Sequence, residues 1–185
     1  MKHSFISFEK LSGEIKNEIE LFHRSKTQNN PLATLEESMI KWFDEKFDGW
    51  LMRKYGPKGG TSRRKHFRLE VEIPIRIIDT LIESSKDDAH AHEFIGKIVN
   101  ISRGGLYFKY QAPIEISSII KVIIALSSIE RDLKDAEALA MVVRADKIAE
   151  REYGIGIMFS SIYDESRNNL NLFILKNLSY YIYSQ

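Results

Sequence analysis

The sequence predicts a mainly β protein with flanking helices, in which a small antiparallel β-domain of six strands lies between an N-terminal helical region and a C-terminal helix. Two observations support this prediction. Apolar residues recur every three to four positions in the first 55 residues and again from residue 164, which is the period of an amphipathic helix. Between them, after a linker rich in Gly and Pro, apolar and polar residues alternate as in half-buried strands.

The N-terminal region is expected to form two amphipathic helices. The first covers residues 5–24, and the polar run 28–31 ends it. The second covers residues 34–55 and begins with Thr34 and Glu37, which form a capping-box pattern. Its aromatic stripe is expected to form a core or a helix-pair interface. The stripe consists of Trp42, Phe43, Phe47 and Trp50.

Six strands are expected after the linker. They cover residues 69–77, 94–99, 106–110, 119–126, 139–145 and 154–159. Short strands separated by turns predict a barrel or a sandwich. Pro74 cannot donate a ladder hydrogen bond, so it predicts an edge or a bulge, and the polar run 83–92 predicts a hairpin loop. The expected domains are 1–60 (helices and linker), 61–165 (β-domain) and 166–185 (C-terminal helix).

The composition narrows the possible functions. The 185 residues have a net charge of +1, with 27 basic and 26 acidic side chains, so a globally basic nucleic-acid binder is not indicated. The chain has no cysteine, which excludes disulfides, thiol catalysis and cysteine-ligated metals. No secretory signal and no apolar run near the ~18 residues of a membrane span are seen. We therefore expect a cytoplasmic protein without a membrane span.

Positive charge is concentrated in the segment 63–68, which contains Arg63, Arg64 and Arg68. A guanidinium group is planar and permanently charged; it can bind a phosphate or the O6/N7 edge of guanine through two hydrogen bonds, and it can stack on a base. Arg64 and Arg68 are close enough in sequence to converge on one ligand. Taken alone, the segment also fits a solvated basic tether at a domain boundary.

A small polar turn follows between two apolar runs. Asn100 can donate and accept hydrogen bonds, which suits a base edge, and Ser102 can donate to a phosphate oxygen. Ile101 is expected to point to the opposite face of the strand. Gly104 and Gly105 permit positive φ and a close approach of ligand to backbone. Taken alone, these residues also fit an ordinary turn.

The two segments, in this order around a strand and a hairpin, resemble the signature of the PilZ domain, the bacterial receptor module for cyclic di-GMP. That signature is Arg-x-x-x-Arg followed by Asp/Asn-x-Ser-x-x-Gly. The resemblance covers roughly residues 61–165 and implies a six-stranded PilZ-type β-barrel. Residues 1–60 show no such resemblance.

The resemblance also implies roles for individual residues. Arg64 and Arg68 would hold guanine edges and phosphates, Asn100 would meet a guanine edge, and Ser102 would meet a phosphate or its bound water. Gly105 would leave room for the base. The family's more frequent Asp is Asn here, which lacks the charge that pairs with the guanine N1–H and N2–H₂ donors. An arginine at position 63, just before the signature, is compatible with two intercalated ligand molecules.

Other motifs are weaker. The stretch 154–156 (Gly-Ile-Gly) lacks the third glycine and the following helix of a dinucleotide-binding loop, so a strand is expected there. The stretch 90–93 (His-Ala-His-Glu) has no third ligand cluster that would complete a metal site. No triad order, P-loop or paired-carboxylate motif is evident. We expect no enzyme activity, no metal and no cofactor.

Three functional hypotheses follow. In the first, cyclic di-GMP orders the segment 63–68, reorients the N-terminal helices and changes a contact with an unidentified protein partner, in control of motility, adhesion or biofilm formation. The alternative is a ligand-independent PilZ-like interaction or oligomerisation module, with a homodimer formed through the terminal helices. The third is a barrel that binds single-stranded nucleic acid. The near-zero net charge and the lack of an aromatic ladder beside the arginines count against it.

Overall fold

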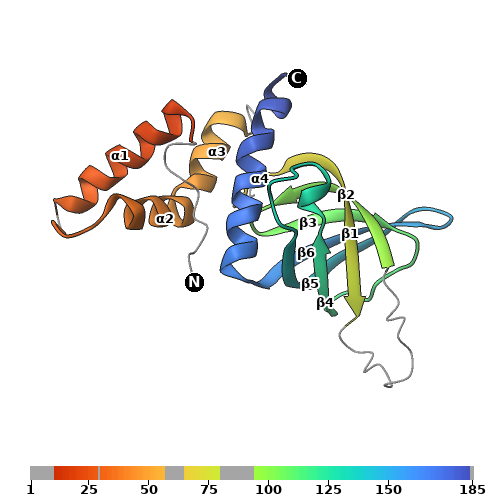
Figure 1. Cartoon of the computed structure of the whole chain (residues 1–185). Helices are drawn as coiled ribbons and strands as arrows, with labels where there is room; N and C mark the ends of the chain where they lie inside the picture. The colour runs from red at the N-terminus through yellow and green to blue at the C-terminus, as the bar shows by residue number, and fades with distance from the viewer. Residues whose placement is uncertain (1–10, 29, 57–64, 80–93, 184–185) are drawn as a thin grey trace. The chain divides into compact units, whose positions relative to one another are not determined.

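The computed structural model describes residues 11–28, 30–56, 65–79 and 94–183 (Figure 1). Contacts between residues divide the chain into two compact units, Met1–Phe67 and Arg68–Gln185. The expected hairpin loop at 83–92 and the 90–93 stretch lie outside the described residues. Among the helices that are described, none has the length and apolar character needed to cross a membrane.

Three helices form the first unit: α1 (Gly13–Thr27), α2 (Leu35–Glu45) and α3 (Phe47–Tyr55). Ser12 is extended and caps α1, since its Oγ accepts a hydrogen bond from the Ile15 amide at 3.5 Å. The first helix therefore begins at Gly13 and not at residue 5. The capping box at α2 is confirmed, because Thr34 Oγ1 accepts from the Glu37 amide at 3.2 Å and Glu37 Oε2 accepts from the Thr34 amide at 3.1 Å.

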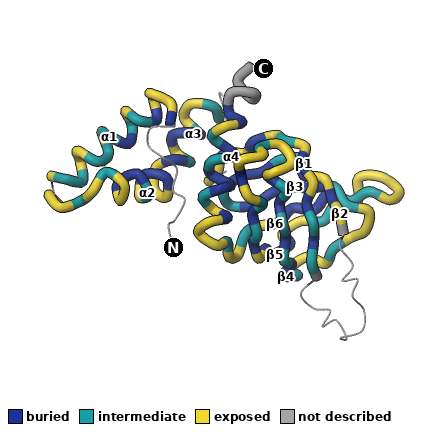
Figure 2. Tube along the Cα trace, in the orientation of Figure 1, coloured by how far each residue is buried: buried dark blue, intermediate teal, exposed yellow. Residues whose placement is uncertain are grey.

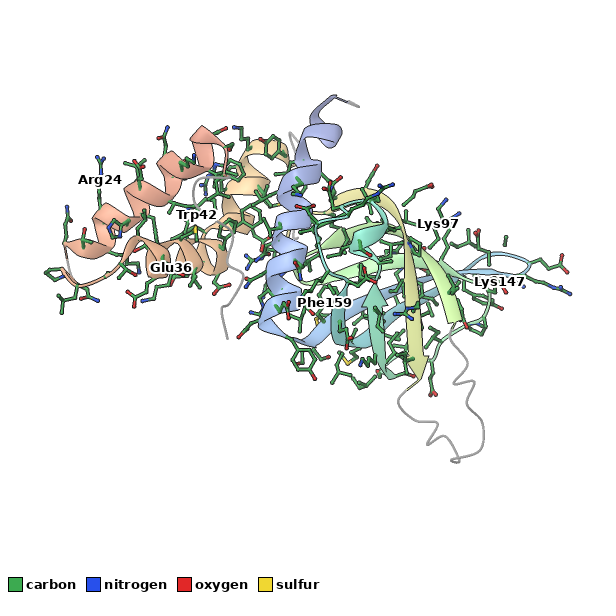
Figure 3. All side chains as sticks on the ribbon, viewed as in Figure 1. Arg24, Glu36, Trp42, Lys97, Lys147 and Phe159 are labelled. Carbon is green, nitrogen blue, oxygen red and sulfur yellow. The ribbon has the colours of Figure 1, made fainter. Side chains whose placement is uncertain are left out.

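The prediction of one helix over residues 34–55 was wrong. Lys46, with φ −118° and ψ −26°, separates α2 from α3. No Gly or Pro marks this break, so local sequence gave no signal of it. The break lets the aromatic stripe of both helices meet in one core, where Phe43 and Phe47 have ring centroids 5.0 Å apart and Trp42 is 1% exposed. Figure 3 shows Trp42 inside the helical unit, with Arg24 and Glu36 projecting away from it.

The second unit is a closed, antiparallel, six-stranded barrel, which confirms the predicted fold class and decides between barrel and sandwich. Its strands are β1 (Leu69–Asp79), β2 (Phe94–Ser102), β3 (Gly105–Tyr110), β4 (Ile119–Ile124), β5 (Ala136–Ala149) and β6 (Glu152–Ile162). Around the barrel they follow the order β1-β2-β3-β6-β5-β4. The inner faces carry the core (Figure 2). One buried row crosses five strands: Leu69, Ile101, Leu106, Ile157 and Val142.

Pro74 marks neither an edge nor a bulge. The strand β1 pairs with both β2 and β4, and its bulge lies between Glu70 and Ile73. The pairing of β1 with β4 starts only at Ile75, one residue after the proline. The Pro74 carbonyl accepts a hydrogen bond from the Ala125 amide at 3.1 Å. The N and C=O of a strand residue point to the same side, so the Pro74 nitrogen faces β4. The regular β1–β4 pairing does not extend to Pro74, so its lack of an N–H breaks no bond of that ladder.

The C-terminal helix α4 (Asp164–Tyr183) is confirmed and packs on β1, β5 and the short helix η2 (Leu126–Ser128). Its apolar contact residues are Leu170, Phe173, Ile174 and Leu178, all buried. At its first turn, Ser166 Oγ accepts a hydrogen bond from the Glu137 amide of β5 at 3.0 Å. Further along, the Lys176 ammonium lies 2.6 Å from an Asp132 carboxylate oxygen. The helix is therefore part of the same compact unit as the barrel.

Candidate ligand-binding site

Arg68 is the arginine of the predicted site that the structure describes; Arg63 and Arg64 lie outside the described residues. Arg68 is exposed and stands immediately before β1, whose first residue, Leu69, pairs with Ile101 of β2. Asn100 and Ser102 flank Ile101 on either side. Strand pairing therefore brings the start of β1 and the end of β2 to the same place on the barrel.

Asp48 of α3 contacts His66 and Phe67, the two residues that immediately precede Arg68 in the sequence. His66 Nδ1 lies 2.8 Å from Asp48 Oδ2, and the Phe67 amide donates to Asp48 Oδ1 at 3.4 Å. The Phe67 ring is 3% exposed and meets the Tyr55 ring edge-on at 6.4 Å. Burial raises the pKa of Tyr55 above its ordinary value, so this ring is neutral at physiological pH. Asp48 was missed by sequence reasoning, since nothing local links it to the arginine segment.

A β-bulge sets the orientation of Asn100. The register of β2 against β3 shifts between Ile98 and Asn100, which places Val99 in the bulge. Ile98 and Ile101 are both 0% exposed, while Val99 and Asn100 are part-exposed on the outer face. Without the extra residue, strict alternation would point Asn100 inward like Ile98. The prediction that Ile101 points away from Asn100 is thus confirmed.

Asn100 has a polar neighbour on each adjoining strand. It pairs with Glu70 of β1 and with Tyr107 of β3. Glu70 is exposed, and directly opposed residues in antiparallel strands have Cβ atoms about 4.5–5.5 Å apart. The Glu70 carboxylate therefore lies beside the Asn100 amide, at the position where the PilZ signature more often has Asp.

Ser102 closes the hairpin between β2 and β3. It is 6% exposed, and its Oγ donates to the Gly105 carbonyl at 2.8 Å. In this arrangement the hydroxyl proton stabilises the turn, so Ser102 can offer a ligand only the remaining lone pairs of its oxygen. The turn is also tied to β6, since the Gly104 carbonyl accepts from the Phe159 amide at 2.9 Å.

Gly105 is required by the barrel itself. A Cβ at this position would lie 2.1 Å from the Ile157 carbonyl oxygen of β6, and Gly105 is paired with the neighbouring Met158. Its φ lies outside the left-handed region. The close approach of two strands therefore explains this glycine without any reference to a bound base.

Other candidate motifs can be placed as well. Residues 154–156 lie within β6, so the strand expectation is confirmed and a dinucleotide-binding loop is excluded. Among the described residues, no three His, Cys, Asp or Glu side chains gather as metal ligands would.

The closed six-stranded barrel, with its polar motif at adjoining ends of β1 and β2, defines the class of domain. The profile of the PilZ domain matches residues 62–176. This range contains every residue of the predicted ligand site and none of the N-terminal helices. The chain belongs to the PilZ domain family. Comparison with curated protein sequences finds no significant match.

Three solved structures are similar to part of this chain at low sequence identity. The Bacillus subtilis inhibitor of motility MotI/DgrA is 17% identical with a TM-score of 0.50; the match covers 64% of this chain and 52% of that one. The PilZ domain of Escherichia coli YcgR with c-di-GMP is 10% identical with a TM-score of 0.46, covering 66% and 95%. The K. pneumonia MrkH–c-di-GMP complex is 13% identical with a TM-score of 0.48, covering 66% and 56%. This chain thus corresponds to about half of MotI/DgrA.

Proposed function

We propose that this protein binds cyclic di-GMP and converts binding into a changed contact with a protein partner, as a bacterial cytoplasmic effector without enzyme activity of its own. One observation carries the proposal: the pairing of Leu69 with Ile101 brings Arg68 next to Asn100 and Ser102 on a domain of the PilZ family. A guanidinium and a part-exposed amide at one place suit a ligand that combines phosphates with guanine edges. Motility, adhesion or biofilm control is the proposed setting.

Replacing Arg68 by alanine should weaken cyclic di-GMP binding by about 1–3 kcal/mol, the scale of a charge-assisted or bidentate contact. The measurement is a calorimetric titration of the full chain. Arg131→Ala is the matched control, because Arg131 is an exposed arginine in the loop between η2 and β5. If wild type shows no saturable binding at high-micromolar ligand, the receptor proposal fails. Equal affinity of Arg68→Ala and wild type would remove Arg68 from the site.

The contacts of Asp48 suggest how binding is passed on. The ligand would hold Arg68, and the preceding residue, Phe67, is buried against Tyr55 and bonded to Asp48. A ligand that holds Arg68 would therefore act on α3 through Phe67 and Asp48.

Asp48→Ala should uncouple the helices from the ligand. The variant loses the bond to the Phe67 amide and the contact with His66, each worth about 0.5–1.5 kcal/mol. Hydrogen exchange at Phe67 should become faster, and cyclic di-GMP should no longer change exchange in α3, while affinity stays within a few-fold of wild type. Glu36→Ala, at an exposed carboxylate of α2, is the control. A ligand-dependent change in α3 that survives in Asp48→Ala would rule out this route.

The alternative function is a ligand-independent interaction module, and exposed apolar side chains on the outer face of β4, β5 and β6 favour it. These are Ile119 at 40%, Leu139 at 41%, Val143 at 49% and Met158 at 46% exposure. In that case oligomeric state and partner binding would be the same with and without cyclic di-GMP and in Arg68→Ala. A homodimer through the terminal helices belongs to this alternative.

A further inference from the structure

A row of paired residues continues from Asn100 across the outer face of the barrel. Asn100 on β2 pairs with Tyr107 on β3. Tyr107 pairs in turn with Gly156 on β6, and Gly156 with Arg144 on β5. The next row along these strands, through Ile101, is the buried row of the core. Since side chains alternate between the two faces of a sheet, Asn100, Tyr107 and Arg144 share the outer face.

Two glycines of β6, Gly154 and Gly156, leave the space that the Tyr107 ring occupies. A Cβ at Gly154 would lie 1.7 Å from Tyr107 Oη, and a Cβ at Gly156 would lie 3.8 Å from Tyr107 Cδ2. The same point at Gly156 is 3.2 Å from the Cβ of Arg144. The Gly-Ile-Gly stretch therefore leaves the space in which the aromatic ring lies along β6 and meets the arginine.

Arg144 is held in place from two sides. Its guanidinium carbon lies 5.8 Å from the centre of the Tyr107 ring, within cation–π range. Its Nε donates to the carboxylate of Asp146, two residues along β5. The side chain is still 66% exposed. A guanidinium has five N–H donors. The bond from Nε to Asp146 uses one of them, so the other N–H donors remain for a ligand on the solvent side.

We propose that Arg144, oriented by Tyr107 and Asp146, is a further guanine-recognition residue that binds the O6/N7 edge of one base of the dinucleotide. This inference rests on the proposed function. The backbones at Asn100 and Arg144 are three strand spacings apart, about 14 Å at the usual spacing, so the two side chains suit two separate bases. Cyclic di-GMP has two guanines, and Asn100 and Arg144 address one each.

The test compares cyclic di-GMP and cyclic di-AMP in calorimetric titrations of the full chain. Arg144→Ala should bind cyclic di-GMP about 10- to 100-fold more weakly, since a bidentate arginine–guanine contact is lost. Adenine has an amino group in place of O6, so Arg144 cannot make the same two hydrogen bonds to it. Cyclic di-AMP should therefore bind Arg144→Ala and wild type with similar affinity. Arg144→Lys should not restore affinity, because an ammonium lacks the planar fork. Tyr107→Leu, which removes the ring beneath the guanidinium, should weaken binding in the same direction.

Two controls separate recognition from folding. Arg131→Ala should bind like wild type, and the thermal midpoint of Arg144→Ala should be unchanged, because its side chain is mostly exposed. If wild type binds cyclic di-GMP and Arg144→Ala binds equally well, this inference is overturned and the proposed function stands. Full rescue by Arg144→Lys would also overturn it, since charge alone would then suffice. Absence of binding by wild type would overturn both.

Discussion

Replacing Gly105 by alanine should destabilise the barrel by about 1–3 kcal/mol or more, the cost of forcing extra atoms into a packed interior. The new Cβ would lie 2.1 Å from the Ile157 carbonyl oxygen. That oxygen belongs to the backbone of β6 and cannot rotate away as a side chain would. Relief requires β3 and β6 to separate, next to the hairpin that the bond from Ser102 Oγ to the Gly105 carbonyl closes.

The measurement is the midpoint of chemical denaturation, with cyclic di-GMP affinity measured where the variant is still folded. Gly13→Ala is the control, because a Cβ at Gly13 meets nothing within 4 Å. It should change stability little. An unchanged midpoint for Gly105→Ala, combined with lost binding, would contradict the packing account and support the role that the family signature implies for this glycine, which is room for a base.

Trp42→Ala should cost the helical unit about 3–5 kcal/mol, the usual range for deleting a large buried aromatic side chain. Trp42 is 1% exposed, and its ring lies 5.2 Å from Phe43, 5.8 Å from Phe47 and 6.1 Å from Trp50, centre to centre. The loss therefore combines a cavity with broken aromatic contacts. A unit of three short helices has little stability to spare.

Tryptophan fluorescence is a selective probe for this experiment. The chain has two tryptophans, at positions 42 and 50, and both lie in the helical unit. In Trp42→Ala, Trp50 reports the unfolding of that unit alone, and circular dichroism of the strands reports the barrel. Trp42→Phe, which keeps an aromatic ring, should recover part of the stability. A denaturation midpoint of Trp50 fluorescence equal to that of wild type would show that this ring cluster does not hold the helices together.

Much of the fold was predictable because its signals are local. The period of apolar residues predicted helices and strands, Thr34 and Glu37 predicted the start of α2, and six strands were found where six were expected. The break at Lys46 was not predictable, because no Gly or Pro marks it and the aromatic stripe continues on both sides of it. The expectation at Pro74 failed because the partner strand ends there, which no property of Pro74 reveals.

The sequence by itself determined the residue types of the candidate site and their order along the chain: an arginine segment, then Asn100, Ser102 and Gly105. Only the tertiary structure decided which way they face and what they touch. The bulge at Val99 turns Asn100 outward, Ile157 explains Gly105, and strand register places Arg144 in the row of Asn100. The physical reason is that register and bulges depend on pairing between strands far apart in sequence, where a shift of one residue moves a side chain to the other face.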